Sequence, residues 1–177
     1  MSDVVADFSS GEEFRVDLDL PDQRYVVKDS DGRIVALLPM GVGGEVFTRT
    51  DRWNLKVERH NLSWAVVAHT ADDGVEVGGI AEGLIPDSHK LWIGTDTVYH
   101  VTENPLNASW SIKDGHAHLV TLTNLTLSSS TITTLNEPTD PATLALAIIL
   151  TLELIKAESS IPGVGAGGGG PGTPYAP

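Results

Sequence analysis

The chain has 177 residues, enough for one domain with a substantial hydrophobic core. Its 24 Asp and Glu against 11 Lys and Arg give a formal net charge of −13, which argues against nucleic acid as a partner because a polyanion would be repelled. Cysteine is absent, so disulfides, thiolate metal sites and a catalytic thiol are excluded.

The N-terminal part of the chain is predicted to be a flexible segment, residues 1–11, followed by a strand. Residues 1–11 contain neither the basic nor the apolar segment of a secretory signal, so we expect a cytoplasmic protein. From residue 14 the sequence FRVDLDL alternates apolar and polar side chains, which predicts a β-strand with one face in the core.

Three hairpins of similar design are predicted next, over residues 25–38, 64–80 and 110–122. Each has an Asp-Gly pair between two apolar runs, which indicates a tight turn in which both turn residues have positive φ. Their recurrence indicates repeated supersecondary units. Further β-rich runs bring the expected total to about 10–12 strands, a number and spacing typical of a sandwich or barrel. These runs are 45–49, 53–58, 90–93, 97–102 and 123–135.

The sequence TDPATLALAIILTLELIKAE, residues 139–158, predicts a helix over 141–157 that is apolar on every side. Asp140 can cap its free N–H groups, and Pro141 suits the first helical position. Its charge-free part is about 12 residues long, whereas a membrane span needs ~20, so we expect a buried helix and no transmembrane segment. A helix that is apolar all round must be surrounded by other elements.

The expected fold class is therefore mainly β, an antiparallel closed β-barrel around a central hydrophobic C-terminal helix. Closing one sheet around the helix buries all its sides and removes exposed strand edges. A β-sandwich with the helix laid on it is the alternative. The barrel is expected to span residues 12–158. Residues 159–177, rich in Gly and Pro, are predicted to be a disordered tail because they can bury little apolar surface.

Three segments resemble the tubby C-terminal-like superfamily, and within it the LURP-one-related branch; phospholipid scramblases are a more distant likeness. They are YVVKDSDGRIVALL (25–38), SWSIKDGHAHLV (109–120) and the helix, and the resemblance covers residues 14–158. It implies a β-barrel threaded by a central C-terminal helix. Tubby proteins bind phosphoinositides through basic residues, so phospholipid headgroups are a partner that the resemblance implies.

Candidate metal ligands are few. His116 and His118 lie two residues apart on a predicted strand and so share a face, and His100 on another strand could add a third ligand. No zinc motif accompanies them, and solvated histidines on the outer face are the competing interpretation. We expect no metal and no cofactor.

Glu153 is the one acidic residue inside the apolar helix. It is expected near the barrel mouth, solvated or paired with Lys156 three residues on. Buried without a partner, it would be a candidate functional site.

The absence of a motif that places a nucleophile beside a base favours a non-enzymatic module. Its expected partners are another protein or phospholipid headgroups at a membrane surface. The alternative is a small-ligand binder or enzyme with a site at the barrel mouth, using Glu153, His116 or His118.

Overall fold

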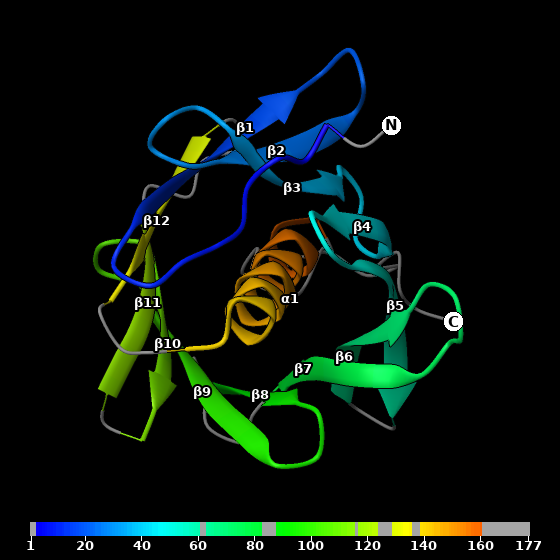
Figure 1. Ribbon diagram of the computed structural model, residues 1–177. Coiled ribbons are helices and arrows are strands. Elements are labelled where there is room, and N and C mark those ends of the chain that lie inside the picture. Colours follow the sequence, from blue (N-terminus) through cyan, green and yellow to red (C-terminus); the bar gives the residue numbers. More distant parts are fainter. Residues whose placement is uncertain are drawn as a thin grey trace.

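A closed barrel of twelve antiparallel strands surrounds one helix in the computed structural model, which describes residues 3–60, 63–82, 88–115, 117–123, 129–135 and 139–160 (Figure 1). The expected fold class is confirmed. The strands are β1 (Glu13–Asp19), β2 (Arg24–Lys28), β3 (Ile34–Pro39), β4 (Gly44–Thr48), β5 (Arg52–His60), β6 (Ser63–Thr70), β7 (Glu76–Glu82), β8 (Ser88–Ile93), β9 (Thr97–Asn104), β10 (Ser109–Asp114), β11 (Ala117–Thr123) and β12 (Ser129–Thr134).

Each strand pairs with its neighbours in sequence, and the ring closes where β1 pairs with β12, with Phe14 opposite Ile132. Closure pairs each described strand on both sides, and this removes the free edges that could pair with other chains. Because the strands alternate in direction, all connections that follow odd-numbered strands lie at one end of the barrel, and those that follow even-numbered strands lie at the other.

Helix α1 (Pro141–Ser160) lies inside the ring of strands (Figure 1). Leu146, Ile149 and Leu150 are buried, as predicted for the centre of the barrel. The N-terminal cap is also as predicted, because Asp140 Oδ2 accepts a hydrogen bond from the Thr143 N–H at 3.1 Å. In the described part of the chain, no helix has both the length and the apolar composition to cross a bilayer.

The helix packs against β6, β7 and β8. On β7, Gly78 makes this approach possible: a Cβ there would lie 3.3 Å from Leu146 Cδ2 and 2.6 Å from the Trp92 carbonyl oxygen. The missing side chain thus provides room for the helix.

The three predicted hairpins are present as β2–β3, β6–β7 and β10–β11, so they recur every four strands around the ring. Their turns differ from the predicted two-residue form: glycine has positive φ in each, whereas the preceding aspartate does not. A register shift precedes each turn and lengthens the loop. The glycines are Gly32, Gly74 and Gly115, and the shifts follow Val27, Ala68 and Ile112.

The N-terminal segment departs from the predicted flexible start. Val4, Ala6 and Phe8 are buried, and the N–H groups of Val5 and Ala6 donate to the Ile34 carbonyl oxygen at 3.0 and 3.2 Å. This segment adds an apolar layer to the barrel end at which α1 begins (Figure 1). At the other terminus the helix continues through Ser160, and the rest of the predicted tail, 161–177, lies outside the described residues.

Candidate functional site

Glu153 is fully buried, in contrast to the predicted solvated position, and it has two partners. Its Oε1 forms an ion pair with Lys156 Nζ, which confirms the predicted pairing, and its Oε2 accepts a hydrogen bond from the Gly43 N–H at 2.8 Å. The carboxylate is therefore neither solvated nor unpartnered, because the β3–β4 turn (residues 40–43) covers this end of the barrel.

Lys156 connects the helix to the same turn. Its Nζ also donates to the carbonyl oxygens of Pro39 at 2.8 Å and Gly41 at 3.1 Å. The ammonium lies 5.7 Å from the centroid of the Tyr25 ring, within range of a cation–π interaction. Only 11% of the Lys156 side chain is exposed, so this end of α1 is held by polar contacts that solvent scarcely reaches.

Burial governs the electrostatics of this pair. It raises the pKa of Glu153, against the opposing effects of the Lys156 charge and the Gly43 hydrogen bond. Burial also lowers the pKa of Lys156, against the charge of Glu153. Burial, and then the charge of Glu153, raise the pKa of Tyr25. Because the carboxylate and the ammonium are engaged with each other and with the turn, the arrangement holds this end of the helix in place.

Gly43 is the residue of the turn that sequence reasoning missed. Its φ of +84° favours glycine, and a Cβ there would lie 2.9 Å from the Leu55 carbonyl oxygen. The short sequence GVGG signals a loop but gives no indication that one of its N–H groups binds a carboxylate 110 residues away.

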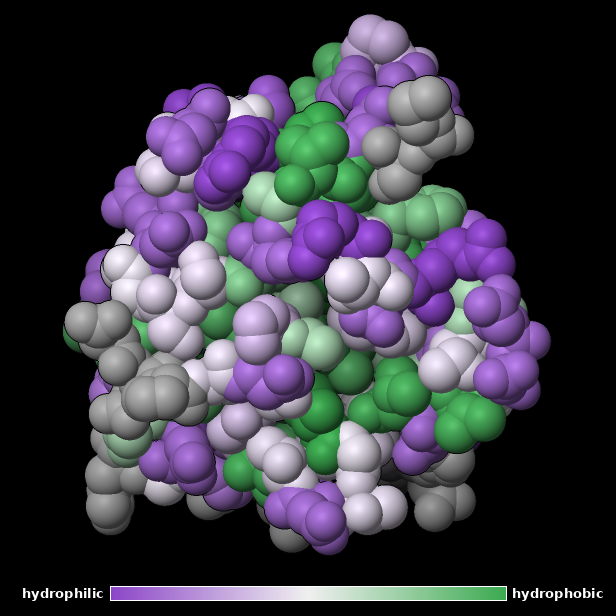
Figure 2. Space-filling model, in the orientation of Figure 1, coloured by the Kyte–Doolittle hydropathy of each residue, from purple (hydrophilic) through white to green (hydrophobic). Residues whose placement is uncertain are grey.

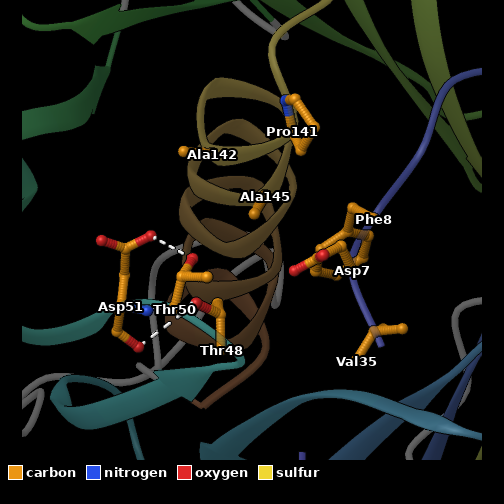
Figure 3. Close-up of a pocket in the computed structure, with 9 residues that line it drawn as sticks. All are labelled: Asp7, Phe8, Val35, Thr48, Thr50, Asp51, Pro141, Ala142 and Ala145. Carbon is orange, nitrogen blue, oxygen red and sulfur yellow. Dashed lines mark hydrogen bonds between the residues drawn. The ribbon is translucent and has the colours of Figure 1, made fainter. Parts of the chain in front are cut away.

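A small cavity lies at the opposite end of the barrel, beside the first turn of α1. Figure 3 shows Asp7 and Phe8 on one side of the helix and Thr48, Thr50 and Asp51 on another. Its volume is about 20 Å³, room for roughly one water molecule. The Asp51 carboxylate accepts from Thr50 Oγ1 at 2.9 Å. In Figure 2, which faces this end, hydrophilic side chains surround smaller apolar areas.

The structure describes two of the three candidate histidines. His116 lies outside the described residues, whereas His118 on β11 and His100 on β9 are exposed on the outer wall. The register places Lys113 between them, directly opposite both. A cationic side chain between two imidazoles disfavours a metal ion there. Among the described residues, no group of three or more His, Asp or Glu is arranged to hold a metal.

The geometry thus defines a class of protein: a closed β-barrel filled by its own C-terminal helix. Comparison with family models, curated proteins and solved structures finds no match. The tubby-like and LURP-one-related resemblance stays a prediction based on the quoted segments.

Proposed function

We propose that this protein is a non-enzymatic interaction module of the cytoplasm that binds another protein on the outer surface of its barrel. The observation that carries the proposal is the filled interior: α1 occupies the space inside the ring, and its residues from Leu144 to Leu154 are buried. A ligand must then bind to the outside of the barrel. A closed ring with a locked helix is a rigid surface, which lowers the entropic cost of association.

Two observations count against the alternative of a small-ligand site or an active site at the barrel mouth. Glu153 is fully buried and already paired. The cavity beside α1 has about 20 Å³, far below the ~300 Å³ typical of ligand pockets.

Affinity capture with the full-length protein tests the proposal. We expect a protein partner that, once purified, rebinds saturably at a stoichiometry defined by isothermal titration calorimetry. The proposal would be overturned if no protein rebinds while a small molecule raises the melting temperature in a ligand screen.

A membrane surface is the second candidate, and a specific observation favours it. Three turns at the end where α1 finishes carry exposed apolar residues: Leu20 (63% exposed), Met40 (38%) and Leu106 (95%). These turns all follow odd-numbered strands, so they lie at the same end of the barrel. Exposed apolar residues of this kind can enter the boundary of a bilayer.

Sedimentation with phosphatidylcholine vesicles, with and without phosphatidylserine, separates the two candidates. For the protein-binding module we expect the protein in the supernatant. If it pellets, Leu106→Asp should release it when the apolar end is responsible. Val75→Asp is the control, since Val75 is also an exposed apolar residue (57%) but lies on the β6–β7 turn at the opposite end of the barrel.

A further inference from the structure

We propose that the outer wall of β8–β11 is the docking surface for an acidic segment of a partner protein. This inference rests on the proposed function and specifies its partner. The inference is based on four basic side chains that the strand register places in line. We call these residues the basic row: Lys90, His100, Lys113 and His118.

The basic row crosses four adjacent strands without a gap. Lys90 of β8 lies opposite His100 of β9. His100 lies opposite Lys113 of β10, which in turn lies opposite His118 of β11. Their side chains point outward: Lys113 is half-buried and the other three are exposed. With neighbouring strands ~4.8 Å apart, the row is roughly 14 Å long.

The basic row gathers four basic side chains without an acidic partner among the described residues of an acidic protein. None of its four side chains makes a hydrogen bond or ion pair within the described ranges, and Asp114, which follows Lys113, forms no ion pair with it. By contrast, Arg33, Arg49 and Arg52 each hold an aspartate at 2.7–2.8 Å. The ammonium groups of Lys90 and Lys113, two strands apart in the row, therefore have no acidic partner in the described residues, and a negative charge supplied from outside would pair with them.

A row of hydroxyl groups runs beside the basic row, two residues along β8, β9 and β10 and, because of the register shift after Ile112, three residues along β11. Ser88 lies opposite Thr102, Thr102 opposite Ser111, and Ser111 opposite Thr121. Hydroxyls can donate to carboxylates and also accept from backbone N–H groups. The combined surface therefore suits a peptide segment, which has both kinds of group.

The size and charge of the surface favour a short segment over an extended polyanion. An extended chain rises ~3.3 Å per residue, so about four residues cross the row. A nucleic acid or an anionic membrane would also face the rest of a molecule whose net charge is −13, which opposes approach. A local cluster of Asp or Glu on a protein avoids most of that repulsion.

The test is a titration of the ¹⁵N-labelled full-length protein with a deca-glutamate peptide at low ionic strength, with a (Gly-Ser)₅ peptide as the uncharged reference. We expect amide shift changes clustered at the basic row that disappear in 300 mM salt. Lys113→Glu should weaken binding at least fivefold. The control is Lys56→Glu, the same charge change on β5, which should weaken peptide binding less than twofold. Lys56 is also exposed and also without an ion pair in the described residues, but it lies three strands away from β8 around the ring.

The inference would be overturned if the shift changes are absent or scattered, or if the two variants weaken binding equally. Binding of a single-stranded oligonucleotide or phosphatidylserine vesicles at the row, without binding of the peptide, would assign the surface to another class of partner and also overturn it. Failure here is distinguishable from failure of the proposed function: a captured protein that binds wild type and Lys113→Glu equally would leave the interaction module standing.

Discussion

Replacing Lys156 by Met tests whether the buried ion pair holds the helix in the barrel. The substitution keeps the length of the side chain and removes the ammonium that contacts Glu153, Pro39 and Gly41. Glu153, which is fully buried, would retain only the Gly43 N–H as a partner. Removing one member of a buried pair costs about 3–5 kcal/mol, which corresponds to a fall in melting temperature of roughly 6–20 °C for a chain of this size.

Urea unfolding followed by tryptophan fluorescence measures this loss, since Trp64 and Trp110 are buried reporters. A variant with Met at both 153 and 156 should lose less than the single variant, because no charge is then left without a partner. Together with the single variant Glu153→Met, these two variants complete a double-mutant cycle, which gives the coupling free energy of the pair.

The pH dependence supplies an independent check. Burial raises the pKa of Glu153, so the folded state keeps this proton at pH values where the unfolded chain has lost it. Stability from this group is then present at low pH and decreases as pH rises through that window. The loss caused by Lys156→Met should therefore be smaller at pH 5 than at pH 8. A loss below 1 kcal/mol, or one that does not change with pH, would refute the locking role.

Three further perturbations follow from the fold. Gly78→Ala should destabilise by about 1–3 kcal/mol because its Cβ would meet Leu146 and the β8 backbone, whereas Gly41→Ala, with open space around it, should leave the melting temperature nearly unchanged. Burial would raise the pKa of Asp29, but the hydrogen bonds and charge of Arg33 outweigh this effect and lower the pKa. The stabilisation that ionised Asp29 provides is lost as pH falls through that lowered value. Asp29→Asn should therefore lower the melting temperature more at pH 7 than at pH 3. A chain that ends at Asn136 should show no cooperative melting transition, because the barrel would lack its filling; a sharp transition would contradict this.

Local patterns predicted most of the architecture. The strand that begins at residue 14, the Asp-Gly hairpins and the Asp140–Pro141 helix start are each set by neighbouring residues, and the structure confirms them. The predicted inward position of Leu20 is wrong, because β1 ends at Asp19 and Leu20 is exposed in the turn that follows. The all-round apolar character of the helix added the one long-range conclusion, that a sheet must enclose it.

Features that depend on contacts distant in sequence escaped prediction. Val4, Ala6 and Phe8 are separated by polar or exposed residues, and their burial depends on a barrel end that the sequence does not display. The i,i+3 spacing predicted the Lys156 partner of Glu153, but its Gly43 partner required the fold. The basic row exists only through the register of four strands, and single residues gave no sign of it.

The position of α1 after all twelve strands in the chain has a consequence for biosynthesis. At ~5–20 residues per second, a ribosome needs roughly 7–28 s to make the 140 residues that precede the helix. During that time the inward-facing side chains of the strands have no helix to pack against, and the pairing of β1 with β12 joins segments more than 100 residues apart. The nascent chain thus exposes the most apolar strand surface just before the helix emerges, and this is the interval in which shielding of that surface would reduce aggregation most.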